Sequence, residues 1–386
     1  MVSSLDNLRV LDFSRVLAGP FATMMMADLG AQVTKVERPD VGDDTRAWGP
    51  PYDDHGEATY FLSVNRNKHS IALDLSDPAD LEHARRLAGE ADIVVENFRS
   101  GVMERLGLGE ADLRARNPGL IYCSITGFGH GAGAALPGYD LLVQALGGLM
   151  SVTGPPQGEP AKVGVALVDV LAGLFSTVGI LAALQHRNVT GEGQKVEVDL
   201  LSSLLSALVN QGAAFSAGGE VPGRLGNAHP SIAPYELLAC AEGDLVLAVG
   251  TDRQFATLCQ VIGDPHLAQD SRFATNPDRV GNRVALRAAL EQNLSRQPAS
   301  DWALELTEAG VPAGVVNDVA SAFALASQLG LDPLVSVPRD DGSMVQLTRN
   351  PIGMSLTPAR YHSAPPRLPE HKPAPARSRL EGLNHA

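Results

Sequence analysis

The stretch LRVLDFSRVLAGPFATMMMADLGAQVTKVE, residues 8–37, contains the pattern that sets the fold class. Its two ends, LRVLDF (8–13) and QVTKVE (32–37), are short runs rich in valine and leucine, as is typical of buried β-strands. The segment PFATMMMADLG between them predicts an amphipathic helix that ends at Gly30. A strand–helix–strand unit of this kind predicts parallel strands covered by helices.

The same alternation continues to about residue 130. Three further strands are predicted at SIALDL (70–75), DIVVEN (92–97) and LIYCSIT (120–126). The segment DPADLEHARRLAGEA predicts a helix whose first turn contains Pro78. We therefore expect an α/β domain with a mostly parallel sheet and helices on both faces.

The remaining chain predicts a second, smaller α+β domain and a return to the first. An apolar helical pattern runs from Pro137 to Leu184, followed by a strand at 195–200 and a helix at 199–215. ELLAC and DLVLAVG predict a hairpin, and SMVQLT (343–348) predicts a late strand. The expected domains are residues 1–224, 225–310 and 311–386, the last including a proline-rich tail that should lie on the surface or be mobile.

Composition limits the possible partners and the compartment. The formal net charge of −14 over 386 residues argues against nucleic acid, which needs a basic surface. Three widely spaced cysteines resemble neither a disulfide framework nor a metal site, and the N-terminus has no secretory pattern. We expect a cytoplasmic protein without a metal, and we interpret the apolar run 163–184 as a buried helix rather than a membrane span.

Asp169 is the only charged residue between Val163 and Leu184. A carboxylate in an apolar run is costly unless it is satisfied, and two interpretations remain open. Asp169 is either the N-cap of the helix that follows it or a partly desolvated nucleophile. The loop SRVLAGP lacks the G-x-G-x-x-G spacing of dinucleotide sites, so a nicotinamide cofactor is disfavoured.

Other polar residues follow the predicted strands, where ligands of parallel sheets bind. Arg15 and Arg38 follow the first two strands and either hold a phosphate or pair with a nearby acid. Phe98 either stacks on a base or belongs to the core. His229 is expected to stabilise its loop.

Taken together, the chain resembles the class III (CaiB/BaiF-type) CoA-transferases over nearly its whole length. The matching segments include residues 10–46, NRNKHSIALDL, ADIVVENFRSGVMERLGL, ITGFG, PGYDLLVQALGGLMSVTG, VALVDVLAGLFSTVGILAAL, GNAHPSIAPY, VGTDRQF and AGVPAGVVND. The resemblance implies a Rossmann-like large domain, a small domain, and an interlocked homodimer whose struts lie near 200–225 and 310–330. Coenzyme A is then a substrate, and no tightly bound cofactor is expected.

The resemblance also implies roles for particular residues. Asp169 matches the family's catalytic aspartate, which attacks the thioester of an acyl-CoA. The expected coenzyme A contacts are Val16, Leu17, Ala18, Arg38, Leu73, Asn97, Phe98 and Arg105. The expected acyl contacts are Trp48, Tyr60 and Tyr139. Ser76 and Pro137 stand where some members have lysines, and His130 replaces a glutamine, so those contacts and the role of His130 stay open.

Two alternatives to CoA transfer remain at this point. An α-methylacyl-CoA racemase needs a histidine before the aspartate of Gly138–Asp140, where this chain has Tyr139, a poor base at neutral pH. A non-catalytic CoA-binding scaffold is disfavoured by the retained aspartate. Between acid partners, the LMSVTG and VGTDRQF segments resemble dicarboxylate-using members, so succinyl-CoA is the expected donor and a small carboxylic acid the acceptor.

Overall fold

The computed structural model describes residues 2–371, so most of the predicted mobile tail lies outside the described residues. The chain divides into two compact units. Unit 1 consists of residues up to Gly147, Gly164–Ala213 and the chain from Asp332 onward, and unit 2 of Gly148–Val163 and Ala214–Leu331. Unit 2 takes in more of the chain than the range 225–310 expected for a small domain.

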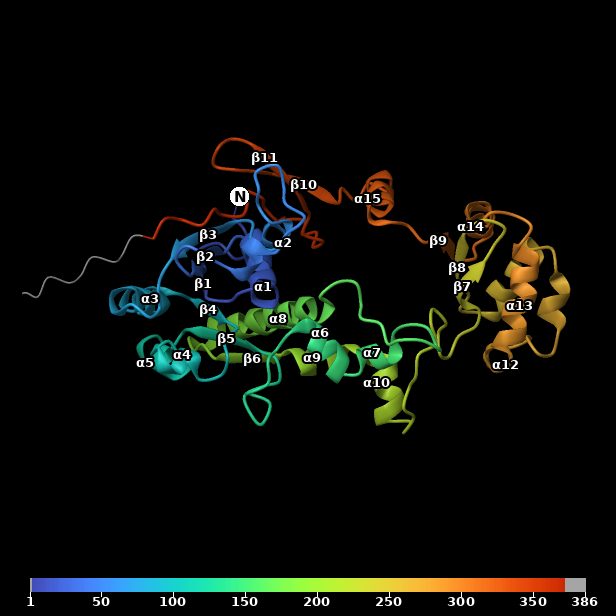
Figure 1. The fold of residues 1–386 in the computed structure, drawn as a ribbon, viewed down its shortest axis with the longest axis horizontal. Coiled ribbons are helices and arrows are strands. Elements are labelled where there is room, and N and C mark those ends of the chain that lie inside the picture. The colour runs from blue at the N-terminus through green and yellow to red at the C-terminus, as the bar shows by residue number, and fades with distance from the viewer. Residues whose placement is uncertain (1, 372–386) are drawn as a thin grey trace, which may run out of the picture. The chain divides into compact units, whose positions relative to one another are not determined.

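Unit 1 is built on a six-stranded sheet in which every pairing is parallel, which confirms the predicted α/β class (Figure 1). Its strands are β1 (Arg9–Asp12), β2 (Gln32–Glu37), β3 (Lys68–Ala72), β4 (Ile93–Glu96), β5 (Ile121–Thr126) and β6 (Lys195–Asp199). The order β3-β2-β1-β4-β5-β6 reverses between β1 and β4. A reversal of this kind opens a crevice at the carboxyl ends of the strands, where ligands bind.

β3 begins two residues before the predicted run 70–75. The sequence pattern misses the first two residues of β3 because Lys68 and His69 are polar, whereas strands of a parallel sheet are usually continuous apolar runs. Lys68 is nevertheless fully buried, and its ammonium lies 3.2 Å from the Asp12 carboxylate in β1. The ion pair lets a charged side chain be buried even though it comes from the edge strand of the sheet.

Helices cover both faces of this sheet. α1 (Ala18–Asp28) and α8 (Leu167–Thr190) pack against each other, while α3 (Pro78–Glu90) and α5 (Glu110–Arg116) pack together elsewhere. Neighbouring residues of β5 show that these are opposite faces, because successive side chains of a strand alternate. Tyr122 belongs to the core that includes the α3 and α5 side chains, whereas Cys123 lies beside Ser176 of α8.

Between β5 and β6 the chain is less regular than predicted. The helical pattern expected from Pro137 to Leu184 is divided into three helices: α6 (Asp140–Leu146), α7 (Leu149–Val152) and α8, which starts only at Leu167. Gly148 separates the first two helices with a φ of 85°, which glycine adopts readily. After β6, α9 (Leu200–Ala207) and α10 (Val209–Ser216) replace the single predicted helix.

α8 is the one described helix that is long and apolar enough to cross a membrane by length and composition. About 44% of its most apolar 18-residue window is buried within the chain. The buried residues, such as Ala172, Gly173 and Ile180, face α1 and the sheet. α8 therefore serves as a core helix of unit 1, with a second apolar face that is exposed in the single chain.

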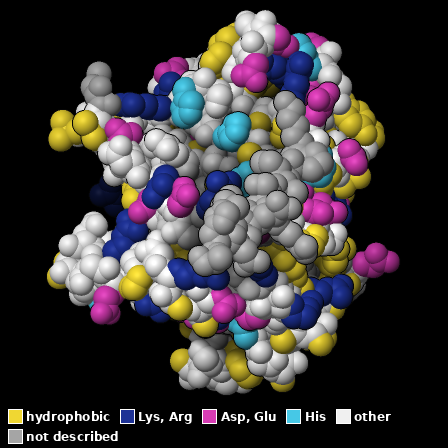
Figure 2. All heavy atoms as spheres, turned by 90° about the vertical axis from the view of Figure 1, so that its left-hand side faces the viewer, with side chains coloured by type: hydrophobic (Ala, Val, Ile, Leu, Met, Phe, Trp, Pro, Cys, Tyr) yellow, Lys and Arg dark blue, Asp and Glu magenta, His cyan; other side chains and the backbone are white. Residues whose placement is uncertain are grey.

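Smaller elements complete unit 1. The hairpin of β10 (Leu334–Pro338) and β11 (Met344–Thr348) confirms the predicted late strand and shares a core with Leu62 of α2 (Thr59–Ser63). A 3-10 helix, η1 (Asp44–Ala47), follows β2, and α4 (Val102–Arg105) follows β4. On the face drawn in Figure 2, basic and acidic side chains are intermingled rather than gathered into separate areas.

Unit 2 combines a three-stranded antiparallel sheet with helices. The sheet contains β7 (Tyr235–Ala239), β8 (Asp244–Ala248) and β9 (Ala313–Val315), so the predicted hairpin is confirmed. The helices are α11 (Asp252–Val261), η2 (Pro265–Gln269), α12 (Asn276–Gly281), α13 (Arg283–Leu294), α14 (Ala299–Glu308) and α15 (Val319–Gln328). Phe255, Phe273 and Trp302 lie at the centre of its core.

Candidate active site

A cavity of about 320 Å³ lies in unit 1 at the carboxyl edge of the sheet, where the strand order reverses. Its walls are the loops after three adjacent strands: residues 15–18 after β1, 97–100 after β4 and 125–139 after β5. Asp169, near the start of α8, also lines it. The cavity therefore brings together residues as far apart in the sequence as Arg15 and Leu200.

The loop after β1 is held from the side by Asn97. The Asn97 amide accepts the Arg15 N–H at 2.9 Å and donates to the Arg15 carbonyl at 2.8 Å. The Arg15 guanidinium lies 4.9 Å from the centre of the Phe98 ring, within range of a cation–π contact. Asn97 and Phe98 both line the cavity. Their contacts with Arg15 hold the loop after β1, which forms another part of the cavity wall.

The next residue of this loop, Val16, is conformationally strained. Its φ is 68°, in the left-handed region that a β-branched residue rarely adopts. Such a conformation costs on the order of 1–3 kcal/mol and tends to occur at functional sites. Leu17 and Ala18 follow directly, line the cavity and begin α1 without a side-chain cap. The first amides of α1 therefore lie at the cavity wall.

Asp169 is not the N-cap of its helix, contrary to one of the two interpretations. α8 begins at Leu167 with Ala166 as the cap residue, so Asp169 lies inside the first turn and makes no capping bond. Asp140 takes the capping role: its Oδ1 accepts the Val168 N–H at 2.8 Å. Position within the helix explains the error, since a cap residue precedes the first helical residue, whereas Asp169 is the third residue of α8.

The carboxylate of Asp169 has no hydrogen bond or ion pair within residues 2–371. Burial raises its pKa to about 7, and the nearby negative charge of Asp140 adds to the effect. A carboxyl group that is half-buried, unpaired and titrates near neutral pH is the kind of group that serves as a nucleophile or base.

Two aromatic residues stand beside Asp169 without lining the cavity. Tyr60 packs in the same apolar cluster as Val16, Ala166 and Val170. Its pKa is raised to about 12, chiefly by burial and then by the negative charge of Asp169. The Trp48 ring meets Tyr60 edge to face with 5.3 Å between ring centres. Of the three predicted acyl contacts, Tyr60 therefore lies beside the start of α8 and Trp48 lies next to Tyr60.

The structure gathers seven of the predicted site residues in this single cavity. They are Val16, Leu17, Ala18, Asn97, Phe98, Tyr139 and Asp169. Arg38 is outside the lining but pairs with Asp44, which is part of it. Leu73 is 4% exposed in the core between the sheet and α3, and Arg105 is exposed at the end of α4.

Two acidic residues that adjoin lining residues of the cavity without lining it themselves were not among the predicted residues. Asp140 caps α8 and also accepts a hydrogen bond from Gln144 at 2.6 Å. Glu96, at the end of β4, is 5% exposed, and burial raises its pKa to about 7. Its carboxylate accepts the Phe98 N–H at 2.8 Å. The sequence shows the motif Gly138–Asp140, but it does not show that Asp140 binds the N–H of Val168, 28 residues later.

The two histidines left open have local partners. His130 lies within hydrogen-bonding distance of Ser100 at 3.2 Å, and its other ring nitrogen is 3.2 Å from Glu197. It therefore joins the loops after β4 and β5 to β6. In unit 2, His229 accepts the Ser231 N–H at 3.1 Å, which agrees with the expected role in stabilising its loop.

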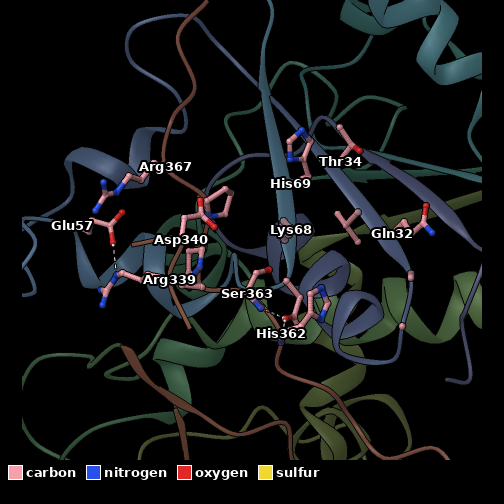
Figure 3. Close-up of a pocket in the computed structure, with 17 residues that line it drawn as sticks. Gln32, Thr34, Glu57, Lys68, His69, Arg339, Asp340, His362, Ser363 and Arg367 are labelled. Atoms are coloured by element: carbon pink, nitrogen blue, oxygen red, sulfur yellow. Dashed lines mark hydrogen bonds and ion pairs between the residues drawn. The ribbon is translucent and has the colours of Figure 1, made fainter. Parts of the chain in front are cut away.

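A larger cavity of about 480 Å³ lies at the opposite, amino-terminal edge of β2 and β3 (Figure 3). Of its charged groups, Arg339 pairs with Asp53 and Glu57 and Arg367 with Asp341, while the Asp340 side chain is exposed. It contains none of the predicted site residues. The smaller cavity, with its unpaired carboxylate, is therefore the candidate active site.

Comparison with known proteins agrees with this assignment. The model of "CoA-transferase family III" matches residues 5–372. A succinate–glutarate CoA-transferase of Agrobacterium fabrum is 43% identical over 95% of this chain and 94% of its own length. The succinyl-CoA:glutarate CoA-transferase of Mus musculus is 39% identical over 96% of this chain and 83% of its own. An acetyl-CoA:oxalate CoA-transferase of Acetobacter aceti is 42% identical over 91% and 89%.

Solved structures show the same relationship. A CaiB/BaiF family protein from Brucella suis has a TM-score of 0.85 and 43% identity, covering 95% of this chain and 97% of that one. Rv3272 from Mycobacterium tuberculosis also has a TM-score of 0.85, with 33% identity over 95% and 97%. The chain belongs to CoA-transferase family III. It is an enzyme that moves coenzyme A between an acyl-CoA and a carboxylic acid.

Proposed function

We propose that this enzyme transfers coenzyme A from succinyl-CoA to another small dicarboxylic acid through covalent adducts on Asp169. Relatives named for succinate, glutarate and mesaconate support a dicarboxylate as donor and acceptor. The observation that carries the covalent route is the unpaired Asp169 carboxylate in the cavity at the sheet edge. Coenzyme A is a substrate in this scheme, and the transfer chemistry needs no resident cofactor or metal.

The first half-reaction releases the donor acid. The Asp169 carboxylate attacks the thioester carbonyl, the C–S bond breaks, and a mixed anhydride and CoA thiolate form. The thiolate then attacks the aspartyl carbonyl of the anhydride, which gives an aspartyl-CoA thioester and frees the donor carboxylate. Each step replaces one difficult transfer by an easier exchange at an acyl carbon.

The second half-reaction repeats the exchange with the acceptor. The acceptor carboxylate attacks the aspartyl-CoA thioester, forming a second anhydride and thiolate, and the thiolate takes the acceptor's acyl group. One acceptor oxygen remains on Asp169 at the end. Amides at the start of α1, beside Asp169 in the cavity wall, supply donors for the tetrahedral oxyanions.

The nucleotide end of coenzyme A is proposed to extend away from Asp169 along the sheet edge. Asn97 and Phe98 stay within the cavity, while Arg38 and Leu73 lie at the ends of the neighbouring strands β2 and β3. Arg105, at the exposed end of α4, completes the proposed nucleotide contacts. Trp48, Tyr60 and Tyr139 are proposed to surround the acyl group.

The homodimer is likewise proposed, and exposed apolar surfaces support it. On α8, Leu174, Phe175, Val178 and Leu181 are 38–64% exposed in the single chain. In unit 2, the apolar helix α15 has no buried residue. Apolar faces of this size normally lie at an interface. A reducing, cytoplasmic setting fits three cysteines that are all free.

Racemase activity is the second candidate, and Tyr139 counts against it. It stands where racemases carry a histidine, is 64% exposed, and carries a phenol in place of an imidazole. A screen of acyl-CoA donors against small carboxylic acids, followed by mass spectrometry, separates transfer from racemisation. We expect succinyl-CoA to donate to glutarate or a similar diacid. Inversion at an α-methyl centre without exchange of CoA would favour the racemase.

Isotope labelling tests the covalent route directly. Glutarate labelled with ¹⁸O in its carboxylates should leave one ¹⁸O atom in the peptide that contains Asp169 after turnover in unlabelled water. Direct attack of the acceptor on the acyl-CoA would leave this peptide unlabelled. The label therefore distinguishes the proposed mechanism from transfer without an aspartyl adduct.

A further inference from the structure

The strained loop at the cavity is clamped by three side chains from distant parts of the chain. Along Ser14–Val16, Lys35 Nζ donates to the first carbonyl oxygen at 2.8 Å. Asn97 binds both backbone groups of the middle residue. The N–H of Val16 donates to the two carboxylate oxygens of Asp43, each at 3.3 Å. Successive backbone polar groups are thus fixed before the chain enters α1.

Asp43 and Lys35 form the least exposed of these clamps. Their charged groups are 2.9 Å apart, and their side chains are 0% and 1% exposed. The Asp43 carboxylate also accepts the N–H and the hydroxyl of Thr45, at 3.0 and 2.8 Å. Every contact of this carboxylate therefore has a defined donor. Buried ion pairs of this kind often add little net stability, so a second role would account for this one.

That second role follows from what Asp43 touches. It does not line the cavity and cannot contact a ligand there, but Val16 does line it. The backbone of a β-branched residue leaves the left-handed region unless its surroundings hold it there. A change of φ at Val16 would swing the start of α1, because Leu17 and Ala18 come next in the chain.

We infer that Asp43, held by Lys35, is a positioning residue that keeps Val16 left-handed and so aims the first amides of α1 at the thioester. This inference rests on the proposed function, because it assumes that an acyl-CoA occupies the cavity. It assigns a task in the reaction to a residue that touches neither substrate nor Asp169. The buried ion pair then stabilises the conformation of the loop that lines the cavity, rather than the fold as a whole.

Asp43→Asn tests the inference. An amide keeps one oxygen that can accept the Val16 N–H, but it replaces the other by an NH₂ group that faces Lys35 and the same N–H, so the clamp on Val16 is weakened. We expect kcat/KM for the acyl-CoA to fall about 10–100-fold, as expected for a misplacement of about 1 Å. The equilibrium Kd for free CoA, measured by calorimetry, should rise in parallel.

The matched control is Asp28→Asn at the other end of α1. Asp28 is also fully buried and bound to a cation, with Arg66 donating to both its oxygens at 2.9 and 2.6 Å, but it is not at the cavity. We expect this variant to lose thermal stability and keep kcat/KM within about twofold. Equal losses of kcat/KM in the two variants would overturn the positioning role.

A double-variant cycle tests the link to Val16. Val16→Gly removes the need for a clamp, because glycine adopts positive φ readily. In that background Asp43→Asn should cost about threefold or less, and an undiminished loss would overturn the inference. Where Asp43→Asn alone does not fold, Lys35→Met with Asp43→Asn removes both buried charges and should still lower kcat/KM.

Failure of the proposed function is distinguishable from failure of this inference. If the native enzyme shows no CoA transfer, the function is wrong, whereas the CoA Kd of these variants still reports on the clamp. If the native enzyme transfers CoA and Asp43→Asn behaves like Asp28→Asn, only the positioning role fails.

Discussion

Asp169 shows how the surroundings of one carboxyl group determine what it can do. Most acidic groups at the carboxyl edge of this sheet are satisfied: Asp43 by Lys35 and Thr45, and Glu37 by Arg46. Asp169 is half-buried, lies near the like charge of Asp140, and accepts no hydrogen bond within the described chain. Its ionised form is therefore poorly stabilised until a substrate arrives, which favours attack on an electrophile.

Asp169→Asn should separate a nucleophile from a structural acid. The amide keeps the shape of the side chain, and the helix start does not depend on it because Asp140 supplies the cap. We expect the variant to fold and bind CoA while transferase activity falls by at least about 10³, because the covalent steps are lost. Steady-state assays with succinyl-CoA measure the loss of activity. Substantial remaining turnover would contradict a covalent mechanism on Asp169.

The same variant should be more stable than the native protein at high pH. The folded pKa of Asp169, about 7, lies above the unfolded value of about 3.9, so the folded state holds the proton more tightly. Native stability attributable to this group therefore falls as pH rises between these values and levels off above pH 7. In thermal melts, the Tm of the Asp169→Asn variant minus that of the native protein should increase from pH 5 to pH 8. A difference in Tm that does not change with pH would contradict the raised pKa.

At the scale of elements, the active site depends on how closely two helix starts approach each other. A Cβ atom on Gly173 of α8 would lie 2.7 Å from the Ala18 carbonyl oxygen, so glycine permits the approach of α8 to α1. Asp140 of α6 then ties the first turn of α8 from the other side. Asp169 and the amides of α1 meet in one cavity because these two contacts fix α8.

Asp140→Asn should shift the pH dependence of the reaction. The Asn oxygen can still accept the Val168 N–H, so α8 keeps its cap, but the negative charge that raises the Asp169 pKa disappears. We expect the rise of kcat/KM with pH to move to lower pH. The shift should be incomplete because burial is the larger cause. An unchanged or higher midpoint would show that Asp140 does not act through its charge.

At the scale of the whole molecule, the apolar surface of the single chain predicts an obligate assembly. The outward face of α8 and the unburied helix α15 would both be exposed to water in a monomer. Threading of one chain through another would make dissociation require unfolding. Analytical ultracentrifugation should show a dimer at every concentration down to nanomolar levels, and a reversible monomer would argue against interlocking.

The sequence by itself determined the parallel α/β unit, the hairpin of β7 and β8, and the family. Strand patterns such as 8–13 and 120–126 are local, and period and composition along the chain suffice to reveal them. It also singled out Asp169, because one charge in an apolar run is visible without a structure. The sequence did not show where the helical pattern after Pro137 is interrupted, and glycines and prolines divide its first part into short helices.

Tertiary structure alone decided what surrounds that aspartate. The cap of α8 comes from Asp140, 28 residues earlier, and the clamp on Val16 from Asp43, 27 residues later. Neither contact follows any local periodicity, since each depends on how loops after separate strands converge at the sheet edge. Whether a carboxylate is a cap, a clamp or a free nucleophile depends on which donors reach it, and only the folded chain brings those donors into place.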